Sequence, residues 1–110
     1  MELLADESHV EATANALQAI AHPVRLQILC ILSNGPTCVQ DIVEALGASN
    51  QSGISQHLAH MRRAGIVKTR KDWNRVYYRL TDPRILRLIL ALRDIFCGSH
   101  GADRKKGRRT

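Results

Sequence analysis

The sequence predicts a mainly helical domain that carries one small β-hairpin. Apolar residues recur at helical spacing in five segments, and Gly, Pro or a polar capping residue stands at most of their ends. Two short runs rich in β-branched and aromatic residues follow the fourth of these segments. With 110 residues, of which 45% are apolar and only 4% aromatic, the chain can form one domain whose modest core is mainly aliphatic.

The first two helices are expected before residue 33. Residues 8–21 are rich in alanine and place their apolar side chains at helical spacing. Pro23 fits the first turn of a second helix, where its missing N–H group is not needed. Apolar residues surround most of this helix up to Leu32, so we expect it to be buried at the centre of the domain.

The third and fourth helices are expected over about residues 38–46 and 50–64. Thr37 and Gln40 have the spacing of a capping box in front of the third helix. Gly47 suits the C-terminal end of that helix, because glycine readily adopts a left-handed conformation. Two helices of this length joined by a short turn are typical of a helix-turn-helix motif.

The expected hairpin pairs residues 67–71 with residues 75–80, and Asp72, Trp73 and Asn74 supply its turn. A hairpin directly after the second helix of a helix-turn-helix motif is the wing of a winged helix-turn-helix domain. The expected element order is four helices, two strands and one last helix.

The last helix is expected from Asp82 and Pro83 to about Cys97. Its apolar residues cover more than one face, so its own domain cannot bury all of them. A partner chain would cover the surplus. We therefore expect a homodimer that forms through the first and last helices.

The fourth helix has one apolar side and one polar side on a helical wheel. Ile54, Leu58 and Met61 gather on the apolar side, and His57 lies near it, so we interpret His57 as structural. A polar side of this kind suits a helix whose N-terminal end lies in the major groove, although a merely solvated face is the alternative. The candidate DNA contacts on this helix are Gln51, Ser52, Ser55, Gln56, His60 and Arg63.

The hairpin adds polar and basic residues close to its turn. Such residues could contact phosphates or the minor groove, although a solvated hairpin would also be charged. The candidates are Arg70, Lys71, Asn74 and Arg75.

Charge and composition set further limits. Residues 103–110 account for +4 of the net charge of +6, so we expect a folded domain over residues 1–102 and a basic, disordered tail after it. We find no signal peptide and no apolar run long enough for a membrane helix, and therefore expect a cytoplasmic chain. Three cysteines are an odd, low count that argues against a disulfide framework.

Three stretches resemble the ArsR/SmtB family of arsenic- and zinc-responsive repressors. They are AHPVRLQIL at residues 21–29, NQSGISQHLAHMRRAGIV at 50–67 and RVYYRL at 75–80. The resemblance spans roughly residues 10–97 in the same order. It implies a homodimeric winged helix repressor that binds double-stranded operator DNA and is released when an effector binds.

Two cysteines resemble those of a two-cysteine branch of this family. Cys30 ends the stretch LQILC, and Cys97 ends the stretch DIFC. The resemblance implies that these thiols respond to reactive sulfur species or oxidants, and that a disulfide or a longer polysulfide links them. The alternative for Cys30 is that of a small buried hydrophobic residue.

Metal-sensing relatives provide another interpretation. Cys38 matches the first position of a Cys-x-Cys pair, but Gln40 stands at the second, so a thiolate site lacks ligands there. Near the C-terminus only Asp94, Cys97 and His100 could bind a metal. A metal(loid)-responsive repressor that uses Cys38 or Cys97 with other ligands remains the alternative, and we predict no metal site or cofactor. We interpret Cys38 as an inert surface residue, with a reactive thiol at a helix start as the alternative.

Two other classes of protein compete with a DNA-binding regulator. A winged helix can also serve as a protein-interaction module, which salt-sensitive binding to a palindromic duplex would distinguish from a DNA-binding regulator. A thiol enzyme is not expected, because the sequence has no CxxC motif and no α/β pattern. The sequence leaves open whether the chain represses directly or competes with another regulator.

Overall fold

The computed structural model describes residues 7–47 and 51–96 of the chain. In chain order, this part contains α1 (Glu7–Ile20), α2 (Pro23–Leu32), β1 (Thr37–Cys38), α3 (Val39–Leu46), α4 (Gln51–Arg63), β2 (Val67–Asp72), β3 (Arg75–Leu80) and α5 (Pro83–Phe96). The mainly helical fold with a hairpin is confirmed, and β1 is an addition to the expected order. The predicted domain boundary at residue 102 and the basic tail lie outside the described residues.

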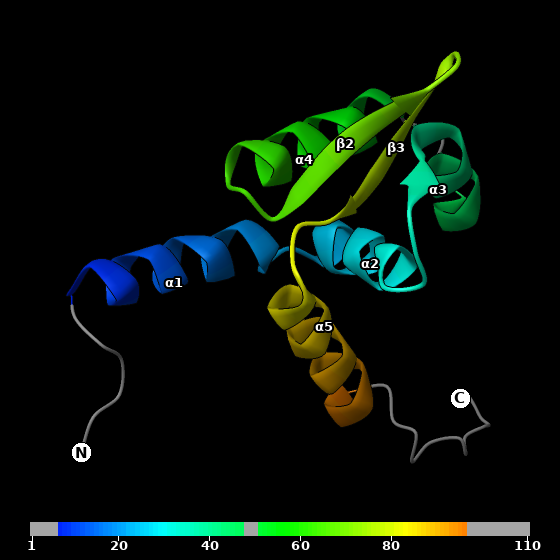
Figure 1. The fold of residues 1–110 in the computed structure, drawn as a ribbon. Coiled ribbons are helices and arrows are strands. Elements are labelled where there is room, and N and C mark those ends of the chain that lie inside the picture. The colour runs from blue at the N-terminus through cyan, green and yellow to red at the C-terminus, as the bar shows by residue number, and fades with distance from the viewer. Residues whose placement is uncertain (1–6, 48–50, 97–110) are drawn as a thin grey trace.

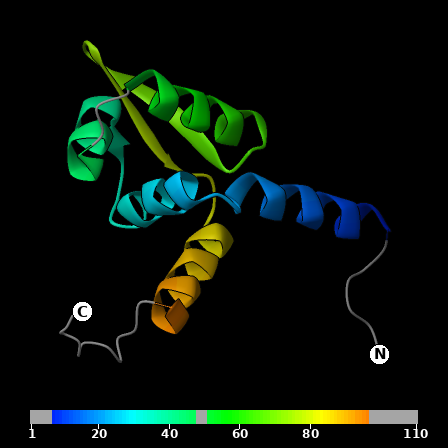
Figure 2. The same ribbon diagram turned by 180° about the vertical axis from the view of Figure 1, so that it is seen from behind.

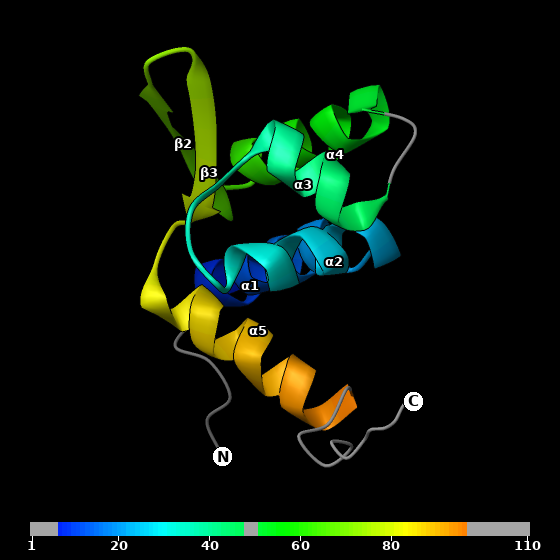
Figure 3. The same ribbon diagram turned by 90° about the vertical axis from the view of Figure 1, so that its right-hand side faces the viewer.

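Helix α2 lies at the centre of the domain, as its apolar circumference predicts. It packs against α1, α3, α4 and α5 (Figures 1 and 3). Ile28, Leu29 and Leu32 are buried in the core. The N-terminal end of α2 is capped by the His22 side chain, whose Nδ1 accepts a hydrogen bond from the Val24 N–H at 3.1 Å.

Strand β1 corrects two expectations at the start of α3. Thr37 does not cap the helix, because it pairs with Tyr78 of β3 and its hydroxyl donates to the Gly35 carbonyl at 3.0 Å. Cys38 is the N-cap residue instead, and its side chain makes no capping hydrogen bond. Cys38 is also fully buried, so the expectation of a surface cysteine was wrong. A two-residue strand has too little sequence to produce a periodic pattern.

The wing is the long part of an antiparallel sheet with the strand order β1-β3-β2. Its register runs from Val67 opposite Leu80 to Asp72 opposite Arg75, so β2 extends one residue further than expected and β3 has the expected bounds. The wing projects past α4, away from α5 (Figures 1 and 2).

Helix α5 begins after Asp82, whose carboxylate accepts hydrogen bonds from the N–H groups of Arg84 and Ile85 at 2.7 and 3.2 Å. The hydrogen bond from the Arg84 side chain lowers the pKa of Asp82, and these backbone donors lower it further, so the cap is charged at neutral pH. Ile89 anchors α5 in the core. Within the described ranges, no helix combines the length and apolar character needed to span a membrane.

Candidate nucleic-acid interface

Helix α4 is held by its apolar side and presents its polar side to solvent. Leu58 and Met61 are fully buried and Ile54 is 5% exposed, which matches the predicted core side. The polar candidates on the other side are all exposed: Ser52, Ser55, Gln56, His60 and Arg63. Gln51 begins the helix, and its side chain lies outside the described part. The packing therefore presents one continuous polar face.

His57 joins α4 to the start of α2. Its Nδ1 accepts a hydrogen bond from the Arg25 Nε at 3.0 Å, and its ring lies 4.4 Å from the ring of His22 between centroids. Arg25 also donates to the Ala19 carbonyl at the end of α1, at 3.3 Å. Burial lowers the pKa of His57, and the neighbouring His22, Arg25 and His60 lower it further. His57 is therefore neutral at neutral pH, as an acceptor at Nδ1 requires, and its structural interpretation agrees with these contacts.

Arg25 is a basic residue that the sequence analysis did not single out. It lines a hollow of about 330 Å³ beside α4, together with Gln56, His57, Ala59, His60 and Arg63. Its position within the family-like stretch AHPVRLQIL could have indicated a functional role for Arg25. Its place beside α4 depends on the tertiary structure, which packs α2 against α4. The hollow extends the basic surface of α4 toward α2.

The four wing candidates, Arg70, Lys71, Asn74 and Arg75, are exposed on the two strands and at the turn. Arg75 also reaches inward, where its Nη1 lies 3.5 Å from the Cys38 Sγ. Coulombic attraction to Cys38 and this hydrogen bond raise the pKa of Arg75, so its guanidinium stays charged. Arg75 thereby ties the wing to the N-terminal end of α3. Trp73, expected only as a turn residue, has a side chain that is 90% exposed at the tip of the wing.

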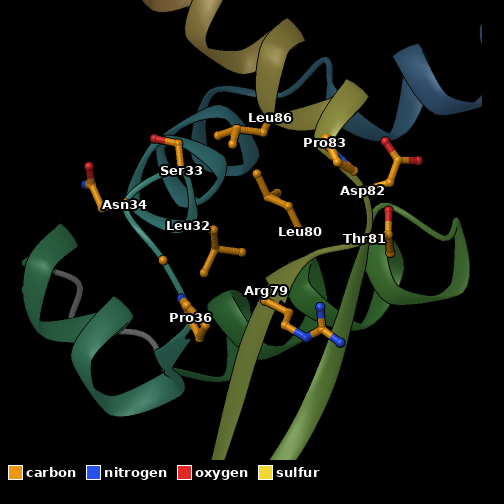
Figure 4. A pocket seen from close by; sticks show the side chains of 11 residues that line it. Leu32, Ser33, Asn34, Pro36, Arg79, Leu80, Thr81, Asp82, Pro83 and Leu86 are labelled. Carbon is orange, nitrogen blue, oxygen red and sulfur yellow. The ribbon is translucent and has the colours of Figure 1, made fainter.

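A larger hollow of about 440 Å³ lies away from this face, between the end of α2, the base of the wing and the start of α5. Leu32, Leu80 and Leu86 extend toward its interior (Figure 4). This lining lacks a cluster of side chains suited to catalysis or metal binding. Across residues 7–47 and 51–96, no group of three or more His, Cys, Asp or Glu residues is arranged to hold a metal ion.

Of the two candidate effector cysteines, Cys30 lies within the described part of the chain and Cys97 does not. Cys30 is half-buried in the last turn of α2 and packs against the core. Cys97 follows α5 and lies outside the described residues, as does His100. The Cys30–Cys97 pairing therefore stays a prediction.

An exposed polar helix face beside a basic wing, with helices on the opposite side, defines the class of winged helix-turn-helix regulators. Residues 22–69 match the family described as bacterial regulatory protein, arsR family. The biofilm growth-associated repressor of Xylella fastidiosa is 37% identical over 91 residues, which cover 83% of this chain and 79% of that protein. The chain belongs to the ArsR family and is a transcriptional regulator rather than an enzyme.

Solved structures of regulators share this fold. Reduced HlyU from Vibrio cholerae has a TM-score of 0.76 and 36% identity, covering 82% of this chain and 94% of that one. The homodimeric winged helix-turn-helix DNA-binding domain of Mb0332 from Mycobacterium bovis has a TM-score of 0.74 and 26% identity, covering 100% of this chain and 99% of that one. The likeness therefore spans the helices outside the helix-turn-helix motif as well.

Proposed function

We propose that the chain is a homodimeric, cytoplasmic repressor that binds a palindromic operator and is released by sulfur or oxidant chemistry at Cys30 and Cys97. The main support for DNA binding is the exposed polar face of α4, which lies beside the basic wing. The buried side chains of Leu58 and Met61 on the other side of α4 hold this helix in place. Gln56 and Arg63 lie on this face and can contact base edges or phosphates in the major groove.

The second protomer is proposed to cover apolar surface on α1 and α5. Val10 and Leu17 are each 49% exposed, and they lie seven residues apart on α1. Leu88 and Ile95 have the same spacing on α5 and are 36% and 64% exposed. A hollow of about 400 Å³ lies between the two helices. Its lining is mainly apolar and includes Leu17 and Leu88, with Asp82 and Arg84 among its charged residues. Such a surface fits an isologous two-fold interface, and the Mycobacterium bovis neighbour is homodimeric.

The first test measures operator binding. A duplex selected by the wild-type protein from a random-sequence library is labelled, and its anisotropy is followed against salt. We expect the logarithm of the affinity to fall linearly with the logarithm of salt concentration. Arg63→Ala should reduce that slope by about 1 for each protomer, whereas Arg87→Ala, an exposed arginine on α5, should leave it unchanged. Selection of no duplex, or binding that ignores salt, would favour a protein-interaction module.

Thiol control is supported by the way α2 meets α5. The Ser33 hydroxyl donates to the Cys30 carbonyl at 2.6 Å, and the Arg93 Nη1 of α5 donates to the Ser33 hydroxyl oxygen at 2.9 Å. Cys30 precedes Ser33 by three residues, which is about one helical turn, and Cys97 follows Arg93 by four residues in the sequence. A bridge between Cys30 and Cys97 would join these helices close to that contact and change the spacing of the two α4 helices.

The proposed chemistry balances with an organic trisulfide, RSSSR, as the oxidant. One cysteine thiolate attacks the central sulfur and releases RS⁻. The second thiolate attacks the same sulfur and releases another RS⁻, which leaves a trisulfide bridge between the two cysteines. Both cysteines are oxidised, and the reagent is reduced to two thiolates.

The second test adds a dialkyl trisulfide to the protein–operator complex. We expect release of wild-type protein, with a mass gain of one sulfur less two hydrogens per protomer. Cys30→Ser and Cys97→Ser should both remain bound, and Cys38→Ser should be released like the wild type. Release of either of the first two variants would remove that cysteine from the mechanism.

The metal(loid) alternative receives less support at Cys38. Its Sγ is fully buried, and the Arg75 guanidinium lies against it. A fixed positive charge at this distance opposes the binding of a metal cation to the same sulfur.

The family relatives include both a repressor and the activator HlyU of Vibrio cholerae. Repression of transcription is therefore proposed and not shown. A reporter gene placed behind the selected operator determines whether the chain lowers or raises transcription.

A further inference from the structure

Trp73 stands at the tip of the wing with a backbone conformation that tryptophan rarely adopts. The pairing of Asp72 with Arg75 leaves Trp73 and Asn74 as a two-residue turn. Trp73 has a φ of 60°, in the left-handed region where hairpin turns usually place Gly, Asn or Asp. Its side chain is 90% exposed, so packing within the described part of the chain does not compensate for the steric cost. Strain that the monomer does not explain is a reason to seek a role in binding.

The surroundings of the Trp73 indole favour a polyanion over an apolar protein surface. Arg70, Lys71 and Arg75 lie within three residues of it along the chain and are all exposed, and Asp72, at the end of β2, is the one acid in that stretch. An apolar partner would desolvate these cations without pairing them. Duplex DNA instead offers phosphates to the cations and a groove to the ring.

The position of the wing indicates which groove of duplex DNA it would meet. The wing tip projects past α4 on the side of the molecule away from α5 (Figures 1 and 3). With α4 in a major groove, a neighbouring projection of this kind meets the adjacent minor groove, as the N-terminal arms of homeodomains do. An indole is flat and apolar, and its one N–H donor matches the adenine N3 and thymine O2 acceptors of the minor groove.

We propose that Trp73 inserts its indole into the minor groove beside each half-site and thereby sets a preference for A·T pairs there. This inference rests on the proposed operator binding and adds a residue and a sequence preference to it. The guanine 2-amino group projects into the minor groove and would obstruct the ring. Trp73 would therefore read flanking positions that α4 does not reach.

The chain supplies its own probe, because Trp73 is its single tryptophan. Tryptophan emission and its quenching by acrylamide are measured for the full-length protein with and without the selected duplex, while anisotropy of the labelled DNA reports binding separately. We expect the emission to shift and acrylamide quenching to fall when DNA binds. Wild-type binding with an unchanged tryptophan signal would overturn this inference and leave the proposed function standing. No binding at all would reject both.

Two variants test whether the Trp73 indole contributes to DNA affinity. Trp73→Gly removes the indole and accepts a φ of 60° without strain, so the hairpin is retained. We expect it to bind about tenfold more weakly, in the range of one lost aromatic contact to a base. Val76→Ala, which truncates another exposed apolar wing residue, should bind like the wild type.

Base substitution provides the independent control. Replacing flanking A·T pairs with G·C should weaken the wild type, and inosine·cytosine pairs, which lack the 2-amino group, should restore binding. Trp73→Gly should be insensitive to both changes. Equal affinity of Trp73→Gly and wild type, or a response to G·C that inosine does not reverse, would exclude minor-groove insertion by Trp73.

Discussion

Replacing both Leu88 and Ile95 with glutamate is expected to yield a folded monomer whose operator affinity is lower by about 100-fold or more. Both side chains are partly exposed in the single chain, so glutamate there meets solvent and the domain keeps its core. In the proposed dimer the same positions are buried, where unpaired carboxylates are strongly unfavourable. A monomer then binds one half-site without the effective concentration that its partner provides.

Sedimentation velocity and operator anisotropy measure the two effects on the same samples. Leu90→Glu is the matched control, because Leu90 is 44% exposed and two residues from Leu88, on the opposite side of α5. We expect this control to remain dimeric. Persistence of the dimer in the double variant would place the interface elsewhere.

Leu58→Ala is expected to destabilise the domain by about 3 kcal/mol, within the range for buried leucines. Leu58 is fully buried in the cluster that holds α4 against α2, and truncation leaves a cavity that its neighbours fill only in part. Urea unfolding at one fixed protein concentration measures the loss, since dimerisation makes stability depend on concentration.

Gln56→Ala is the control for Leu58→Ala on the same helix. Gln56 is exposed, so its removal should change the free energy of unfolding by less than about 0.5 kcal/mol. Its operator binding should nevertheless weaken, because the side chain lies on the proposed DNA face. A loss below about 1 kcal/mol for Leu58→Ala would show that α4 is not held by this packing.

Much of the fold could be predicted, because helical periodicity and the Pro and Gly residues at helix ends are local signals. Pro23 at the start of α2 and Gly47 in a left-handed conformation at the end of α3 stand where their backbone preferences predict. The apolar side of α4 likewise corresponds to Ile54, Leu58 and Met61 in the core. The exposed DNA-binding candidates on α4 follow from the same wheel.

The errors came from contacts between segments distant in sequence. Thr37 matched a capping box, but pairing with Tyr78 of β3 removed it from that role. Cys38 was expected to be a surface residue at a helix start, but β3 and Arg75 cover it. The role of Arg25 beside His57, 32 residues away, has no local pattern.

The amino-acid sequence alone determined the order of the helices, the hairpin and the faces they bury, because periodicity and turn chemistry act over a few residues. It also determined the surplus of apolar side chains on α5. Only the tertiary structure decided the three-stranded sheet, the burial of Cys38, the junction of Arg25 with His57 and the exposed position of Trp73. These features depend on long-range packing and strand register, which bring together segments that no local pattern relates.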